Sequence, residues 1–140
     1  MTPDVLPKLI TELRADAALA ALVGDRIAGV EPKGAWVKGP GQYVAHVVLV
    51  QLDASRITRT PVQRFVIEAR CYGRDFAEAA AVRWAVSEAL HLAGGRTFAN
   101  GLGIYQTLDE SGGAQEKDPQ TDQPYQLLTI TGHATTMAAA

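Results

Sequence analysis

The sequence predicts an α+β fold, in which a small mixed or antiparallel sheet of about four strands packs against two main helices in the order α-β-β-α-β-β. Apolar residues recur at helical spacing near the N-terminus and again after residue 75, which predicts the two helices. They alternate with polar residues before residue 73 and again near the C-terminus, which is typical of half-exposed strands. Because 47% of the 140 residues are hydrophobic, enough for a real core, we expect a single domain over residues 1–140.

The N-terminal segment is expected to form a helix followed by a shorter one. Thr2 is a plausible cap, and apolar residues recur at helical spacing from Val5 to Leu13. Asp16 can cap the stretch AALAALVG, and Gly24 would close it. The glycines and prolines between residues 29 and 41 then predict a loop.

Two strands are predicted in the middle of the chain. Residues 43–52 are rich in β-branched side chains, and residues 62–72 alternate between polar and apolar positions. The expected core face of the second strand consists of Phe65, Ile67, Ala69 and Cys71.

The second strand runs almost directly into a helix from Phe76 to about Ala93. Such junctions carry phosphate loops or nucleophiles in many enzymes, but no G-x-x-x-x-G-K-[ST] or G-x-S-x-G motif is present. Asp75 and Glu78 are instead spaced as a pair that caps the helix. The junction is therefore predicted to be architectural.

The C-terminal part is predicted to add two strands. A short strand at residues 104–108 and a closing strand from Tyr125 flank the polar stretch DESGGAQEKDPQTDQP. We expect residues 109–124 to form a loop that is too long for a tight hairpin. Residues 133–140 are expected to fray.

The residues that could support catalysis have structural explanations. Cys71 falls on the apolar face of its strand, so it is expected to be a buried, inert thiol. The three histidines, His46, His91 and His133, lie on different predicted elements without metal-binding spacing. We therefore expect no metal site and no cofactor.

The charge of the chain argues against two classes of partner. A formal net charge of −2 gives no general attraction to nucleic acid or to an anionic membrane. The longest apolar run, residues 44–52, is far shorter than the roughly 20 residues that span a bilayer.

Charged residues are nevertheless unevenly distributed. Residues 31–64 hold five basic and two acidic side chains, whereas residues 109–122 hold five acidic side chains and one lysine. In a head-to-tail assembly these segments could face each other across a repeated interface. Two independently solvated loops would have the same composition, so both interpretations stay open.

Several stretches together resemble one family. LPKLITELRADAALAALVGDRIAG is similar to the opening of small phage tail terminator proteins, also called tail completion or tail-to-head joining proteins. The most specific part is L-x-x-D-x-A-L-x-A-L-V-G followed by RI. YVAHVVLVQL, FVIEARCYGRDFAEAAAVRWAVSEAL and PYQLLTITGHA resemble later strands and the helix of the family. The chain departs from it at Gln42, where proline commonly stands, and in the length of SGGAQEKDPQTDQ.

The resemblance implies a structural virion protein without enzymatic activity. Its subunits would form a hexameric ring that caps the head-proximal end of the tail tube, stops polymerisation of the tube and joins the tail to the head connector. DNA would pass through the lumen without specific binding, and no membrane would be involved. The ring would assemble in the host cytoplasm and remain in the virion neck.

For such a protein we expect partner contacts at one hairpin tip and in the long polar loop: Arg56, Ile57, Arg59, Asp109, Glu116 and Asp118. Two other functions remain open. One is another neck protein, such as a head-closure or adaptor subunit. The other is a small enzyme or ligand-binding domain with a pocket lined by Trp36, His46 and Tyr72.

Overall fold

A computed structural model of the chain describes residues 5–29, 43–56, 62–92, 96–97, 102–119 and 121–136. Three helices and six strands follow one another in these ranges. They are α1 (Val5–Ala15), α2 (Ala17–Val23), β1 (Ile27–Ala28), β2 (His46–Arg56), β3 (Val62–Tyr72), α3 (Phe76–Leu92), β4 (Arg96–Thr97), β5 (Leu102–Lys117) and β6 (Pro124–Thr136).

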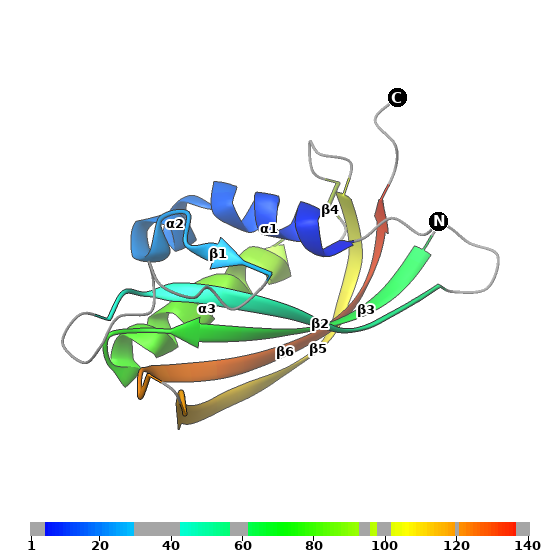
Figure 1. The fold of residues 1–140 in the computed structure, drawn as a ribbon. Coiled ribbons are helices and arrows are strands. Elements are labelled where there is room, and N and C mark those ends of the chain that lie inside the picture. Colours follow the sequence, from blue (N-terminus) through cyan, green and yellow to red (C-terminus); the bar gives the residue numbers. More distant parts are fainter. Residues whose placement is uncertain are drawn as a thin grey trace.

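The strands form one sheet in the order β1-β2-β3-β6-β5-β4. β1 pairs with β2 in parallel, and every other pair is antiparallel, so the sheet is mixed. The four long strands, β2, β3, β6 and β5, lie side by side in Figure 1. The predicted α+β class is confirmed. The predicted four strands are these long ones, and two strands of two residues each add to them.

One hydrophobic core joins all three helices to one face of the sheet. From Phe65 to Cys71, every second residue of β3 belongs to this core, as predicted, and is at most 1% exposed: Phe65, Ile67, Ala69 and Cys71. The helices contribute Leu9, Leu13, Leu19, Val23, Val82, Ala85, Val86 and Leu90. Burial of these side chains stabilises the fold by roughly 1.5–3 kcal/mol for each large aliphatic residue.

The other face of β3 and β6 has a different composition, and we call it the open face. It consists of Arg64, Val66, Glu68 and Arg70 on β3 and Leu127, Thr129, Thr131 and His133 on β6, which are exposed or half-buried. The register pairs these residues across the two strands, for example Glu68 with Thr129. One face of these two strands therefore packs in the core, and the opposite face is accessible to solvent.

The junction between β3 and α3 is built as the capping pattern predicts. A carboxylate oxygen of Asp75 accepts a hydrogen bond from the backbone N–H of Glu78 at 2.8 Å. The Glu78 carboxylate accepts from the backbone N–H of Arg74 at 3.0 Å and from its guanidinium at 2.7 Å. A Cβ on Gly73 would collide with the backbone nitrogen of Ala79, so only glycine fits this turn. The residues of the junction therefore have a structural role: they cap α3 and form the turn before it.

The second helix also begins and ends where predicted. Asp16 accepts a hydrogen bond from the backbone N–H of Leu19 at 3.0 Å. Gly24 closes the helix with a φ of 62°, a conformation that glycine adopts without strain.

The expected loop over residues 109–124 is wrong. β5 continues to Lys117, and β6 begins at Pro124, so only residues 118–123 separate the two strands. Most residues after Leu108 in this strand are polar and two are glycines, so the sequence pattern does not indicate a strand. The strand forms through backbone pairing with β6. The pairing shifts register at three places along β5, which accommodates its length.

Two other boundaries differ from expectation. β2 ends at Arg56, four residues beyond the predicted strand, because Asp53 to Arg56 pair with β3. β6 runs through Thr136, so residues 133–136 of the expected frayed tail are in a strand, paired with β3 and β5. Residues 137–140 lie outside the described part of the chain.

Candidate functional site

The single cysteine is not an activated nucleophile. Cys71 is completely buried in the core face of β3. Burial raises the pKa of its thiol to about 12, so the reactive thiolate does not form near neutral pH. The prediction of a buried, inert thiol is confirmed.

His46 is a buried sheet residue. Its ring stacks on Tyr72, with ring centroids 4.3 Å apart and planes inclined by 8°. Nδ1 lies 2.8 Å from the carbonyl oxygen of Val44, so this nitrogen carries the proton of the neutral ring. Burial lowers the pKa of His46, which keeps the ring uncharged at neutral pH.

The alternative ligand pocket gains no support from these residues. His46 and Tyr72 lie together, but they are only 1% and 2% exposed, and Trp36 falls outside the described residues. Within the described ranges, no group of three His, Cys, Asp or Glu side chains could hold a metal ion. The side chain of His91 is not among those described.

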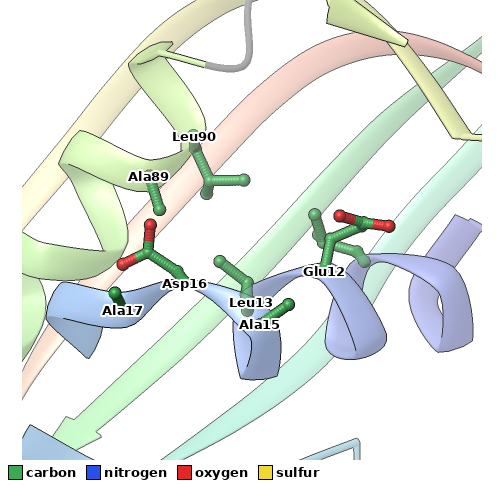
Figure 2. A pocket seen from close by; sticks show the side chains of 8 residues that line it. Glu12, Leu13, Ala15, Asp16, Ala17, Ala89 and Leu90 are labelled. Atoms are coloured by element: carbon green, nitrogen blue, oxygen red, sulfur yellow. The ribbon is translucent and has the colours of Figure 1, made fainter. Parts of the chain in front are cut away.

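A hollow of about 180 Å³ lies between the α1–α2 bend and the C-terminal half of α3. Figure 2 shows the carboxylates of Glu12 and Asp16 on one side of it and Ala89 and Leu90 on the other. Asp16 already caps α2, and the remaining lining is mostly apolar. The hollow therefore lacks a second free carboxylate for acid–base chemistry.

A second hollow of about 380 Å³ opens beside the start of β2 and the first turn of α3. Its charged lining is already engaged: Arg26 donates to the carbonyl oxygen of Ala45 at 2.8 Å, and Arg74 pairs with Glu78 at 2.7 Å. These two arginines therefore stabilise the segment before β2 and the start of α3, and neither is a free group in the hollow.

Among the predicted contact residues that the structure describes, Arg56 lies at one end of the long strands and Glu116 and Asp118 lie at the other, whereas Asp109 lies midway along β5. We call the end of β2, the start of β3 and the end of β6 the arm end, and the turn at residues 118–123 with the start of β2 and the end of β3 the turn end. In Figure 1 the arm end lies at the right and the turn end at the lower left. The sheet register supports this separation, because Arg56 pairs with Gln63 and His46 pairs with Tyr72.

At the arm end, Arg56 is the last residue of β2. Ile57 and Arg59 belong to residues 57–61, which lie outside the described residues. Asp109 lies in β5, where its backbone partner is Thr131 of β6. The six predicted residues therefore do not form one cluster.

At the turn end, Glu116 and Asp118 have different environments. Glu116 is exposed on β5, and its carboxylate accepts a hydrogen bond from the Tyr125 hydroxyl at 2.7 Å. This bond is the main reason that the pKa of Tyr125 rises to about 12. Asp118 is only 5% exposed, in contrast to the solvated loop position expected for it. Its carboxylate accepts from the Tyr72 hydroxyl at 3.0 Å and from the backbone N–H of Thr121 at 3.2 Å.

Two residues that sequence reasoning missed fasten the turn to the start of β2. The Tyr43 hydroxyl donates to the carbonyl oxygen of Thr121 at 2.6 Å. The buried Gln123 amide donates to the carbonyl oxygens of Val44 at 3.0 Å and Gly73 at 3.2 Å. No local pattern could have indicated these bonds, because the partners are 50 to 79 residues apart. The described residues of the turn end are thus held to β2 and β3 by hydrogen bonds between distant parts of the chain.

Helices long and apolar enough to cross a bilayer are absent from the described residues.

The comparisons with known proteins give one family and one similar structure. No curated protein matches the chain. Among solved structures, the chain is similar to a chain of the virion of a native gene transfer agent particle, with 28% identity, a TM-score of 0.54 and 91% of each chain covered. The family model of tail completion protein gp17 matches residues 7–119. Because this match covers most of the chain, the protein belongs to the tail completion protein gp17 family, whose members are structural proteins of phage tails.

Proposed function

We propose that the protein is a tail terminator: a ring-forming virion protein that caps the head-proximal end of the tail tube, stops its polymerisation and joins the tail to the head connector. The family match over residues 7–119 carries this proposal. The similar chain in a gene transfer agent virion supports a place in an assembled particle, next to other structural proteins.

The shape of the subunit suits this function. A subunit between a tube and a connector must present two separate surfaces, and the arm end and the turn end lie at opposite ends of the long strands. We propose that Arg56, Ile57 and Arg59 contact one partner or the next subunit, that Glu116 contacts another partner, and that Asp109, midway along β5, contacts the next subunit. Asp118 supports the second surface from inside, because its carboxylate holds the turn.

The first experiment is the absolute mass of the purified protein by light scattering, alone and mixed with its tail tube protein. We expect the protein alone to have a mass near six subunits, or its complex with tube protein to have a mass that includes six subunits of it. In electron micrographs, added protein should also shorten the tubes that tube protein forms on its own. A monomer that ignores tube protein contradicts the proposal, and binding to the head connector without binding to the tube favours another neck protein.

Charge reversal tests the arm end. The double variant Arg56→Glu, Arg59→Glu should fold normally and fail to complete tails, because the charges that steer and orient a partner are inverted. Glu88→Lys, at an exposed position of α3, is the matched control and should complete tails normally. Normal tail completion by the double variant would contradict the proposed partner contact of Arg56 and Arg59.

A further inference from the structure

Both outer edges of the long-stranded part of the sheet are largely unpaired within the described residues. β1 pairs with only Val47 and Val48 of β2, so no described strand lies against β2 from Leu49 to Arg56. β4 pairs with only Gly103 and Ile104 of β5, so the same holds for residues 105–117 of β5. Unpaired edges of this length are templates for another strand.

The directions of the strands determine which edge could pair with which. β2, β3, β6 and β5 are antiparallel to their neighbours, so the two outermost long strands, β2 and β5, run in opposite directions. A second copy rotated about an axis roughly along the strands keeps these directions. Its β2 would therefore lie antiparallel to β5 of the first copy, as at the other junctions between long strands.

The sequence of the two edges favours a second copy as the partner. Residues 53–56 of β2 include Arg56 and one acidic residue, Asp53, whereas residues 109–112 of β5 include Asp109 and Glu110 and no basic residue. Opposite charges on two edges that run antiparallel favour contact between unlike edges and disfavour contact between two β5 edges. A contact between unlike patches is head-to-tail, the type that closes into a ring.

Irregular pairing limits where the edges can meet. β5 shifts register between Ile104 and Gln106, between Thr107 and Asp109 and between Gly112 and Gln115, and β2 shifts between Gln51 and Asp53. Bulges make an edge a poor template for a foreign strand. The longest regular stretches that remain on these edges are residues 53–56 of β2 and residues 109–112 of β5.

From these observations we propose that copies of this protein join by pairing the β2 edge of one subunit, at residues 53–56, with the β5 edge of the next, at residues 109–112, so that one sheet continues around the assembly. This inference rests on the proposed ring. It adds the surfaces that touch, their direction and the head-to-tail order.

Hydrogen exchange provides the direct measurement on the unmodified protein. The backbone amides of residues 53–56 and 109–112 that point away from β3 and β6 should exchange about tenfold or more slowly in the assembled form than in the monomer, whereas those of the α3 core should change little. Assembly that leaves both edges exchanging as in the monomer overturns this inference and leaves the proposed function standing. Absence of any self-association, alone or with tube protein, contradicts both.

Proline variants test the order of subunits. Adjacent residues in a strand point their N–H groups to opposite sides, so one of Ala54→Pro and Ser55→Pro should spare the bonds to β3 and block the open edge. One of Glu110→Pro and Ser111→Pro should do the same on β5. In each pair, circular dichroism identifies the variant that still folds.

Each folded edge variant alone should remain a monomer under conditions in which the unmodified protein assembles. An equimolar mixture of one β2 variant and one β5 variant should form dimers and nothing larger, because one intact edge of each kind remains for a single contact. Full assembly of either variant alone, or a mixture that stays monomeric, would overturn the head-to-tail edge pairing.

Discussion

The two faces of the β3–β6 strand pair differ, although the same two segments of the sequence supply both through alternate residues. On the covered face, Ile67 and its neighbour Ile130 are at most 1% exposed and pack under the helices. On the open face, the adjacent Val66 and its neighbour Thr131 are half-buried. The alternation of the strands thus separates residues that stabilise the fold from residues available to other molecules.

The open face becomes closed toward the turn end. Tyr72 and His46 belong to the same face by alternation but are almost fully buried, and Tyr72 contacts Tyr125 at a centroid distance of 5.1 Å. The lesson is that one strand can be a surface at one end and a core at the other. Four predictions compare how much residues of the covered face, the open face and its buried end contribute to stability.

The largest effect is expected on the covered face. Ile67→Ala should lower the free energy of unfolding by about 2–5 kcal/mol, because it leaves a cavity in the core. Val66→Ala, one residue away on the open face, should cost less than about 1 kcal/mol. Urea unfolding of both variants is the measurement, and equal losses would contradict the division into two faces.

A smaller effect is expected at the closed end of the open face. Tyr72→Phe removes the hydroxyl that donates to the buried Asp118 carboxylate, which should cost about 1–3 kcal/mol. Tyr125→Phe is the matched control, because its hydroxyl binds the exposed Glu116, and its cost should be lower. The opposite ranking in thermal unfolding would show that the turn does not need the Tyr72 bond.

The pH dependence of stability tests the burial of His46. Burial lowers its folded-state pKa below the ordinary value of 6.5, so the unfolded state takes up a proton first as the pH falls. This contribution is therefore present above pH 6.5 and is lost as the pH falls toward the folded-state pKa. Burial has the largest influence on this pKa; the hydrogen bond to the Val44 carbonyl and the charge of Asp118 favour the charged ring, and Arg26 opposes it.

The variant His46→Gln isolates this contribution. Between about pH 7.5 and pH 5.5, the unmodified protein should lose more stability in urea unfolding than the variant does. Parallel losses in the two proteins would show that His46 does not titrate differently on folding.

The smallest effect is expected at the ion pair of the open face. Arg70 Nε lies 3.1 Å from the Glu68 carboxylate, and the side chains are 36% and 20% exposed. Glu68→Gln should change the free energy of unfolding by less than about 1 kcal/mol, because solvent screens such a pair. The same comparison in high salt should show an even smaller difference. A loss of unfolding free energy as large as that of Ile67→Ala would contradict the distinction between a stabilising face and an open face.

The sequence was sufficient for elements whose evidence is local. The alternation of β3, the caps Asp16 and Asp75 and the closure of α2 at Gly24 depend on residues within a few positions of one another. These features were predicted correctly, as was the burial of Cys71.

Features that depend on distant partners could not be predicted in this way. β5 forms because β6 pairs with it, although its own residues are polar. Asp118 is buried because Tyr72, 46 positions earlier, supplies a donor, and a carboxylate is seldom buried without one. For the same reason, the sequence identified Arg56 and Glu116 as candidate contact residues by their type but did not show that they lie at opposite ends of the sheet.

The burial of Cys71 has a practical consequence for experiments. It is the only cysteine of the chain and is inaccessible in the folded protein, so thiol reagents should leave the native fold unlabelled. A cysteine introduced at a half-buried position of the open face, such as Thr129, would then be the sole reactive site. Fluorophores or spin labels could follow assembly in this protein without prior removal of a native thiol.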